Sequence, residues 1–319
     1  MTRRVQDGVR MEDPLDLWER PVAEHTSMIA GWHQWADAGS VSSGLPEYLV
    51  KHLKARHIGR LRPEGFYLFQ LPGMHDLLRP HIKLLEGYRA ELRQPQDLIH
   101  YWSDEGRALL IFLGDEPHLN AEAYADAFFG VARALGVSRV ATVGGVYAPV
   151  PFDKNRNISC TYSLPRLKKE LLKYEVSFSG YEGGATIGTY LLDRAEGLGI
   201  EYLSLNAMVP LYDLSQLSSG LQGLGIENDY KAWYDVMGRL NHMFDLGLDL
   251  TDLRQRSDST VEAMAARVRQ LEHTHPQLHL REYLARLDAE FTEHTFAPLS
   301  DVWENELEDL FGDESAGTA

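Results

Sequence analysis

The sequence predicts an α/β protein: a central mixed, mostly parallel sheet flanked by helices, followed by an all-helical C-terminal subdomain. Short apolar runs rich in β-branched residues recur from about residue 27 to residue 205, with helix-like apolar spacing between them. Glycine follows several of these runs, as it does where a strand turns toward a helix. Beyond about residue 213 only helical spacing continues, so the helices are expected to form a separate C-terminal layer.

Composition and charge exclude several classes of protein and of binding site. The 319 residues are 44% hydrophobic and 24% charged, as in ordinary globular proteins. Cys160 is the only cysteine, which excludes an intrachain disulfide and a cysteine-based zinc site and suits the cytoplasm. The net charge of -16 disfavours nucleic-acid binding. No run reaches the about 18 apolar residues of a membrane span, and the first residues lack the apolar core of a signal peptide. We expect a cytoplasmic protein that binds neither nucleic acid nor membrane.

The first elements are an N-terminal arm and the start of the sheet. Residues 1–25 are polar, contain two prolines and are predicted to be irregular. The α/β core, residues 26–217, begins with a strand at Ser27–Gly31. A glycine loop and a helix follow, because leucines repeat every fourth residue from Leu45 to Leu53. Strand, glycine loop and helix form half of a βαβ unit.

Further elements of the core follow from the same patterns. The other predicted strands are 65–70, 97–102, 107–113, 140–143, 176–179 and 200–205. Residues 72–93 are mixed and are expected to hold either a short helix or an inserted hairpin. Helices are predicted after Asn120, a candidate N-cap, after Pro165, and over residues 187–198.

The stretch from Arg139 to Pro151 organises this core. Val140–Val143 has the character of a strand buried on both faces of a parallel sheet. Gly144 and Gly145 are predicted to end that strand and to let another group approach the backbone closely. Open α/β sheets bind ligands at the C-terminal ends of their strands, so the sequence predicts a site here.

The C-terminal part is predicted to be a helical lid. Residues 218–311 hold four helical patterns, at 229–244, 259–271, 280–291 and 302–311, and residues 312–319 are a flexible acidic tail. Each helix has one apolar face that must pack on something. We expect the helices to fold over the C-terminal edge of the sheet, with Trp233 or Met237 facing the pocket and a hinge near residues 218–226.

Polar groups and glycines follow the predicted strands and should meet at one edge of the sheet. Carboxylates gathered in a cleft raise one another's pKa values and suit acid–base chemistry. The alternative is that each acid caps a helix N-terminus. Aromatic residues in the same loops fit either ligand stacking or packing. The candidate ligand-binding residues are Trp32, Asp37, Gly39, Asp115, Glu116, Gly144, Gly145, Tyr147, Glu182, Gly183 and Asn206.

Motifs for familiar chemistry are missing from the sequence. Gly183–Gly188 is glycine-rich but lacks the lysine of a phosphate loop. There is no Gly-x-Ser-x-Gly nucleophile elbow. Cys160 and the cluster His273, His275 and His279 are interpreted as structural or surface residues. We therefore predict no catalytic residue, no metal and no cofactor.

Four short motifs in order resemble the proteasome assembly chaperone 2 family over roughly residues 25–215. They are Gly31-Trp32 with Asp37-Ala38-Gly39, Gly114–Pro117, Gly145–Pro151 and Val209–Tyr212. The helical C-terminal region is similar to the extension of the actinobacterial branch. The resemblance implies a phosphorylase/hydrolase-like core, homotrimers and a helical lid. It also implies that archaeal relatives bind the proteasome through a C-terminal hydrophobic–tyrosine–any tail, whereas this sequence ends Ser315–Ala319.

Two functions from different classes fit these observations. The first is a non-catalytic module that binds a ligand or a protein and assists assembly. The alternative is an enzyme of nucleoside-phosphorylase or hydrolase type that acts on a small ligand at the sheet edge. The partners expected are further copies of the chain, and either a small molecule or another protein. Part of the aromatic set in residues 65–102 (Phe66, Tyr67, Phe69, Tyr101 and Trp102) is expected in the subunit interface.

Overall fold

The computed structural model describes residues 14–70, 79–213 and 223–296, and its centre is one ten-stranded sheet. The strand order is β1-β3-β6-β7-β2-β8-β11-β9-β10, with β12 paired to β11. The predicted mixed sheet with flanking helices is confirmed, with its parallel strands gathered in the middle. The strands are β1 (Leu15–Leu17), β2 (His25–His33), β3 (Arg56–Leu61), β6 (Asp97–Asp104), β7 (Arg107–Asp115), β8 (Val137–Ala148), β9 (Ile158–Tyr162), β10 (Ser177–Phe178), β11 (Glu201–Tyr212) and β12 (Leu224–Gly225).

Four parallel strands form the middle of the sheet. β2 pairs with β7 on one side and β8 on the other, and β8 pairs with β11, all in parallel. Their C-terminal ends therefore meet at one edge of the sheet. The outer pairs β3–β6, β6–β7 and β9–β11 are antiparallel.

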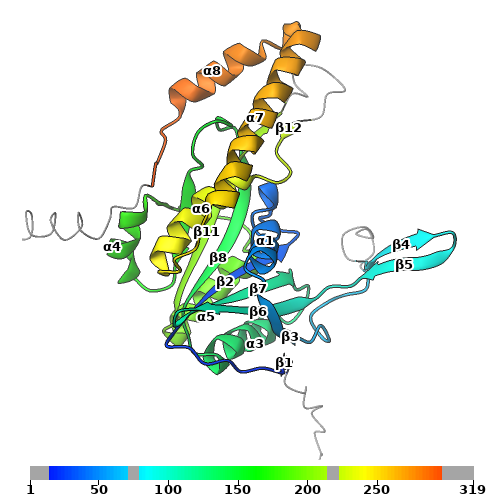
Figure 1. Ribbon diagram of the computed structural model, residues 1–319, viewed down its shortest axis with the longest axis vertical. Helices are drawn as coiled ribbons and strands as arrows, with labels where there is room; N and C mark the ends of the chain where they lie inside the picture. The colour runs from blue at the N-terminus through cyan, green and yellow to red at the C-terminus, as the bar shows by residue number, and fades with distance from the viewer. Residues whose placement is uncertain (1–13, 71–78, 214–222, 297–319) are drawn as a thin grey trace, which may run out of the picture.

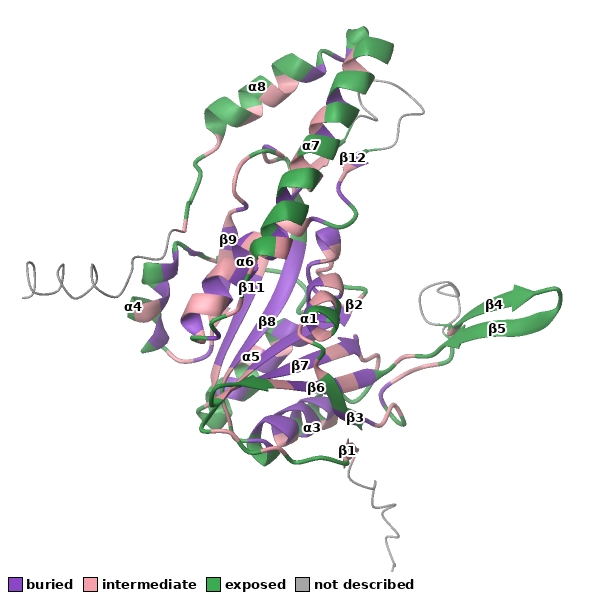
Figure 2. Ribbon diagram, viewed as in Figure 1, coloured by how far each residue is buried: buried purple, intermediate pink, exposed green. Residues whose placement is uncertain are grey.

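Helices cover both faces of the sheet (Figure 1). α3 (Ala121–Ala134) and α5 (Ile187–Leu198) bury one face together with alternate strand residues such as Met28, Leu110 and Val140. α1 (Gly44–His52) and α6 (Tyr230–Met243) bury the other, together with residues such as Ile29 and Ile111. α4 (Leu167–Leu171) packs at the end of this second layer. Figure 2 shows the buried strands between the two helical layers.

The C-terminal helices differ in what they contact. α6 belongs to the core, because Trp233, Val236, Met237 and Leu240 are buried against the sheet. α7 (Thr251–Thr274) extends past the sheet, and α8 (Leu280–Glu290) turns back from its far end (Figure 1). A small separate core lies where these two helices meet the end of β11 and β12. The lid motion stays a prediction: residues 218–222 of its hinge region, and the predicted helix 302–311, lie outside the described residues.

One hairpin stands away from the body. β4 (His81–Leu85) and β5 (Tyr88–Arg93) form a separate two-stranded sheet, which Figures 1 and 2 show projecting to one side with its residues exposed. Glu86 and Gly87 join the strands, both with positive φ, as in the two-residue turns that match strand twist. The described part of residues 72–93 thus forms the predicted hairpin, and residues 72–78 lie outside the described residues.

Three local predictions differ from the structure. β8 runs on through Gly144 and Gly145 instead of ending there. Residues 65–70 form no strand, because Phe66 packs in the core against the ring of Tyr124. Part of the arm predicted to be irregular forms β1, which pairs with β3. No helix among the described residues has both the length and the apolar character to cross a membrane.

Candidate functional site

The loop after β2 folds over β8 at the two glycines. Asp37 and Gly145 form a parallel bridge, and the Gly145 N–H donates to the Ala36 carbonyl oxygen at 2.7 Å. A Cβ on Gly145 would lie 2.0 Å from the Ala38 carbonyl oxygen, and one on Gly144 would lie 2.4 Å from Oδ1 of Asn206. The glycines are therefore needed for the close approach that the sequence predicted, and not for a turn.

Asp37 holds this loop against the start of α1. Its Oδ1 accepts hydrogen bonds from the N–H groups of Ser42 and Ser43, each at 2.9 Å, and its Oδ2 accepts one from the Ser43 hydroxyl at 2.6 Å. Burial nevertheless raises the pKa of the Asp37 carboxyl. Its carboxylate is therefore occupied by hydrogen bonds within its own loop, at the two residues that precede α1.

Gly39 joins the same loop to α6. It has a φ of 62°, and a Cβ there would lie 2.7 Å from Cβ of Asp229. Its carbonyl oxygen accepts from the Asp229 N–H and from Nε1 of Trp233, both at 2.9 Å. Trp233 is therefore fixed against the strand-end loop.

A buried ion pair lies beside this junction. Nε of Arg156 is 2.8 Å from Oδ2 of Asp229, and both side chains are fully buried. Arg156 also donates to the carbonyl oxygens of Pro151 and Lys154. Asp229 in turn caps α6 by accepting from the N–H groups of Lys231 and Ala232. This ion pair thus connects the loop after β8 to the start of α6.

Asp115 ends β7 and Glu116 follows it, and the two acids bond to different segments. Oδ2 of Asp115 accepts from the Gln96 N–H at 2.9 Å, and its Oδ1 lies 3.9 Å from Nη2 of Arg93 at the base of the β4–β5 hairpin. Oε1 of Glu116 accepts from the Ile187 N–H at 2.8 Å, at the start of α5. Burial raises the pKa of Glu116. Each acid already satisfies a backbone donor.

The sequence analysis missed a further buried carboxylate, Asp97 at the start of β6. Asp97 is fully buried and accepts hydrogen bonds from the hydroxyls of Tyr67 and Tyr124, both at 2.7 Å. The Tyr124 oxygen also accepts from Nε1 of Trp32 at 2.8 Å. Burial is the main cause that raises the pKa of Asp97 to about 7. Because these partners come from distant segments, no local sequence pattern signals the network.

The cavity at the strand ends is small. Its volume is about 20 Å³, close to the space that one water molecule needs. Of the acids considered as candidates, Glu116 lines it, whereas Asp37 and Asp115 do not and Glu182 lies exposed in the loop before α5. The walls also include polar residues that the sequence analysis did not single out: Ser42, Thr142, Thr186 and Ser204, beside the predicted Trp32, Gly144 and Asn206.

Exposed apolar and aromatic side chains lie on chain segments that line this cavity or continue from residues that line it. Trp35, which lines it, is 62% exposed. Val146 and Tyr147 follow Gly145 on β8 and are about half exposed, and Tyr181, beside Gly183 in the loop that leads to α5, is 72% exposed. We call these four residues the aromatic rim. The aromatic rim exposes apolar surface to water on segments next to the small cavity.

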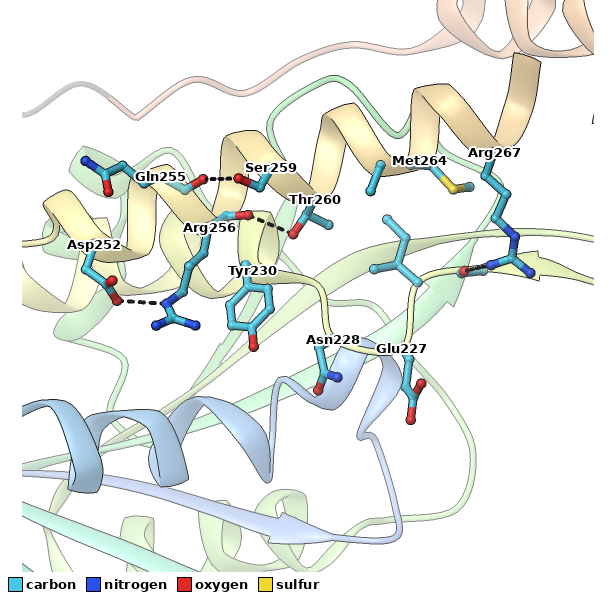
Figure 3. Close-up of a pocket in the computed structure, with 13 residues that line it drawn as sticks. Glu227, Asn228, Tyr230, Asp252, Gln255, Arg256, Ser259, Thr260, Met264 and Arg267 are labelled. Carbon is cyan, nitrogen blue, oxygen red and sulfur yellow. Dashed lines mark hydrogen bonds and ion pairs between the residues drawn. The ribbon is translucent and has the colours of Figure 1, made fainter. Parts of the chain in front are cut away.

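A larger groove lies away from the strand ends, between α7 and residues 225–230 (Figure 3). Its volume is about 620 Å³, within the range of small-molecule sites. Nε of Arg256 bonds to Oδ2 of Asp252 at 2.8 Å, and its guanidinium lies over the ring of Tyr230. Arg267 bonds to the Gly225 carbonyl oxygen at 3.4 Å. In the described residues no three His, Cys, Asp or Glu side chains are grouped to hold a metal.

Comparison with known proteins identifies the family. The PAC2 family model matches residues 31–268. The chain belongs to the PAC2 family. Its matching span includes the strand-end loop, the β4–β5 hairpin, α6 and most of α7. No functionally curated protein sequence matches the chain.

Solved structures share the PAC2 fold at low sequence identity. A PAC2 family protein from Streptomyces avermitilis matches with a TM-score of 0.64 and 23% identity, covering 81% of this chain and 99% of its own. The proteasome-assembly chaperone homologue of Mycobacterium tuberculosis matches with a TM-score of 0.63 and 20% identity, covering 75% and 94%. PbaB of Pyrococcus furiosus, an archaeal proteasome activator, matches with a TM-score of 0.55 and 20% identity, covering 79% and 97%.

Proposed function

We propose that this PAC2 family protein is a protein-binding module that assists the assembly of other proteins, and that it uses the aromatic rim as its docking surface. One observation carries the proposal: the strand-end cavity has about 20 Å³, while Trp35 in its wall and the aromatic side chains on adjoining segments are exposed. A nucleoside needs far more room than one water molecule. Exposed aromatic side chains are typical of the residues that dominate binding at protein interfaces.

The bonding of the acids supports the same proposal. Asp37 and Glu116 accept hydrogen bonds from backbone N–H groups at the starts of α1 and α5, and Asp115 accepts one from Gln96. Each therefore has a structural partner before any substrate arrives. Fold neighbours described as a proteasome-assembly chaperone homologue and a proteasome activator indicate the class of partner to test first: subunits of the proteasome core particle.

Binding to purified proteasome core subunits tests the proposal. We expect Trp35→Ala to weaken binding at least about tenfold, because a truncated central aromatic residue commonly costs that much. Trp18→Ala is the matched control, since Trp18 is also about half exposed but lies beside β3 and His57. If wild type and Trp35→Ala bind equally well, the rim is not the docking surface.

A small-molecule function is the second candidate, and the groove beside α7 favours it by its size. A thermal-shift screen against nucleosides, peptides and cofactors tests it, because a ligand of the folded state raises its stability. A nucleoside or cofactor that raises the melting temperature, together with no binding to proteasome subunits, would replace the assembly proposal by the enzyme or ligand-binding alternative.

We also propose that the protein acts as a homo-oligomer, with a trimer as the expected state. Of the aromatic set expected in an interface, Phe69 is 67% exposed, whereas Phe66 and Tyr101 are buried within one copy. Exposed apolar side chains on the nearby hairpin support self-association more directly. Light scattering at micromolar concentration tests it, and a monomer at all concentrations would refute it.

A further inference from the structure

A further cavity lies beside the C-terminal half of α6, and we call it the α6 pocket. Its volume is about 480 Å³, within the range of small-molecule sites. Its walls come from α6, from the turn that follows α6, and from the segment after α8, which Figure 1 shows running back toward α4. It shares no lining residue with the strand-end cavity or with the groove at α7, so it is a separate site.

Arg239 places a buried positive charge in the wall of the α6 pocket. The residue is 2% exposed. Its Nε donates to the Tyr174 carbonyl oxygen and its Nη1 to the Asp235 carbonyl oxygen, both at 2.8 Å. Its Nη2 donates to the carbonyl oxygens of Glu175 at 3.2 Å and His294 at 3.5 Å. All four acceptors are neutral groups of the main chain.

The carboxylates that act on Arg239 are engaged elsewhere. Among the described residues none forms an ion pair with it, and the acids that influence its charge are Asp235 and Glu175. Oδ2 of Asp235 accepts from the Arg156 N–H at 2.7 Å and lies 3.7 Å from Nζ of Lys231. The side chain of Glu175 is 53% exposed. Burial lowers the pKa of Arg239, because a desolvated charge without a close partner is costly. An anion in the pocket would supply that partner.

Hydrogen-bond donors remain at the pocket for such an anion. An arginine has five N–H groups, and the four bonds of Arg239 leave one of them, on Nη1. Tyr234 and His242 also line the pocket, and neither side chain hydrogen-bonds to another described residue. A guanidinium, a hydroxyl and an imidazole together suit the two oxygens of a carboxylate.

The remaining wall suits a flat apolar body. The Phe296 ring lies 5.9 Å from the His242 ring, measured between centroids, and its centre lies 5.4 Å from the guanidinium carbon of Arg239. Leu250 lines the same pocket. Aromatic rings pack favourably against such side chains. The pocket therefore combines an anion-binding end with an apolar, aromatic end.

We propose that the α6 pocket binds a small aromatic carboxylate, with its carboxylate group at Arg239 and its ring beside Phe296 and Leu250. The site involves no residue of the aromatic rim. It adds a ligand to the protein-binding role proposed above and does not depend on that role.

Calorimetric titration of the full-length protein with 2-naphthoate tests the inference. At the binding efficiency of drug-sized ligands, we expect a dissociation constant of about 1 mM or lower. 2-Naphthamide has nearly the same shape without the negative charge. It should bind at least about tenfold more weakly, because hydrogen bonds between charged groups are the stronger ones.

Gly238→Leu blocks the pocket and leaves the hydrogen bonds of Arg239 in place. Gly238 lines the pocket, and a Cβ there would meet no atom within 4 Å. Leucine also favours a helix more than glycine does, so the variant should fold, and 2-naphthoate should bind at least about tenfold more weakly. Gly130→Leu is the matched control, because Gly130 lies inside α3 with the same open space. It should bind like wild type.

The outcomes that would overturn the inference are distinct. Absence of binding of 2-naphthoate, benzoate and indole-3-acetate at about 10 mM would exclude the ligand class. Equal affinity for 2-naphthamide would exclude the role of Arg239, and equal affinity of Gly238→Leu would place binding outside the pocket. Binding only to the double variant Asp301→Asn with Glu304→Gln would show that acids following Phe296 in the sequence occupy the site in place of a ligand.

Discussion

Arg156→Met should destabilise the fold more than any surface charge substitution. The substitution leaves Asp229 fully buried without its cation, whose Nε lies 2.8 Å from Oδ2 and whose Nη2 lies 3.3 Å from Oδ1. Breaking one partner of a buried pair costs about 3 to 5 kcal/mol, because the remaining charge stays desolvated. We expect the free energy of unfolding to fall by about that amount.

A double-mutant cycle isolates the ion pair. Asp229→Asn keeps the size of the side chain and an oxygen that can cap α6, but removes the negative charge. Combining it with Arg156→Met should cost less than the sum of the two single changes by about 2 kcal/mol, since neither charge is then left alone. Urea titration followed by circular dichroism measures all four proteins, and an unchanged slope shows that the midpoint reports stability.

Arg194→Met serves as the control for the loss of an arginine from an ion pair. Arg194 pairs with Asp126 on the surface, where both side chains are about half exposed, and such pairs contribute little. We expect no measurable change. A strictly additive cycle for Arg156 and Asp229, or an effect of Arg156→Met no larger than that of Arg194→Met, would refute the reasoning.

Two further predictions concern the strand-end edge. Gly145→Ala should lower the free energy of unfolding by about 1 to 3 kcal/mol, because its Cβ would lie 2.0 Å from the Ala38 carbonyl oxygen; Gly197→Ala, which meets no atom within 4 Å, is the control and should not destabilise. Asp97→Asn should flatten the dependence of stability on pH. Burial raises the pKa of Asp97 to about 7 in the folded state, above its unfolded value. The folded state of wild type therefore binds more protons and loses stability as pH rises through about 7. Equal slopes between pH 5 and 8 for both proteins in urea titrations would contradict this.

The strands that the sequence predicts well are those in the middle of the sheet. Residues 107–113 are buried from both sides in β7, so their pattern is continuous and apolar, as for any strand between two helical layers. β9 was missed, although Ile158, Cys160 and Tyr162 alternate with polar residues. A search for alternation alone would have found it.

The errors arise where distant segments decide the local structure. Gly144 and Gly145 suggest a turn in isolation, yet they allow the loop at Ala36 and Ala38 to lie on a continuing strand. Phe66 suggests a strand, but its burial against Tyr124 fixes a loop. A single sequence without its tertiary contacts cannot distinguish a glycine that turns the chain from one that makes room for another segment.

For the candidate site, the sequence predicts where the residues lie but not which groups they bond to. That the strand-end groups lie at one edge follows from the parallel arrangement of β2, β7, β8 and β11. The partners of those groups do not follow from it. Asp37 bonds within its own loop, a local pattern that helix capping explains. Glu116 bonds to Ile187, and no spacing in the sequence connects the two.

The contact between Gly39 and α6 has a consequence for synthesis of the chain. The Gly39 carbonyl oxygen receives its hydrogen bonds from Asp229 and Trp233, so a loop made early waits for a helix made about two hundred residues later. Until α6 leaves the ribosome, the part of this sheet face that it covers, over β8 and β11, lacks its helix. Contacts so distant in sequence slow folding, and uncovered apolar faces aggregate. The nascent protein therefore exposes apolar sheet residues until α6 is made. We expect it to need a chaperone that binds these residues during translation.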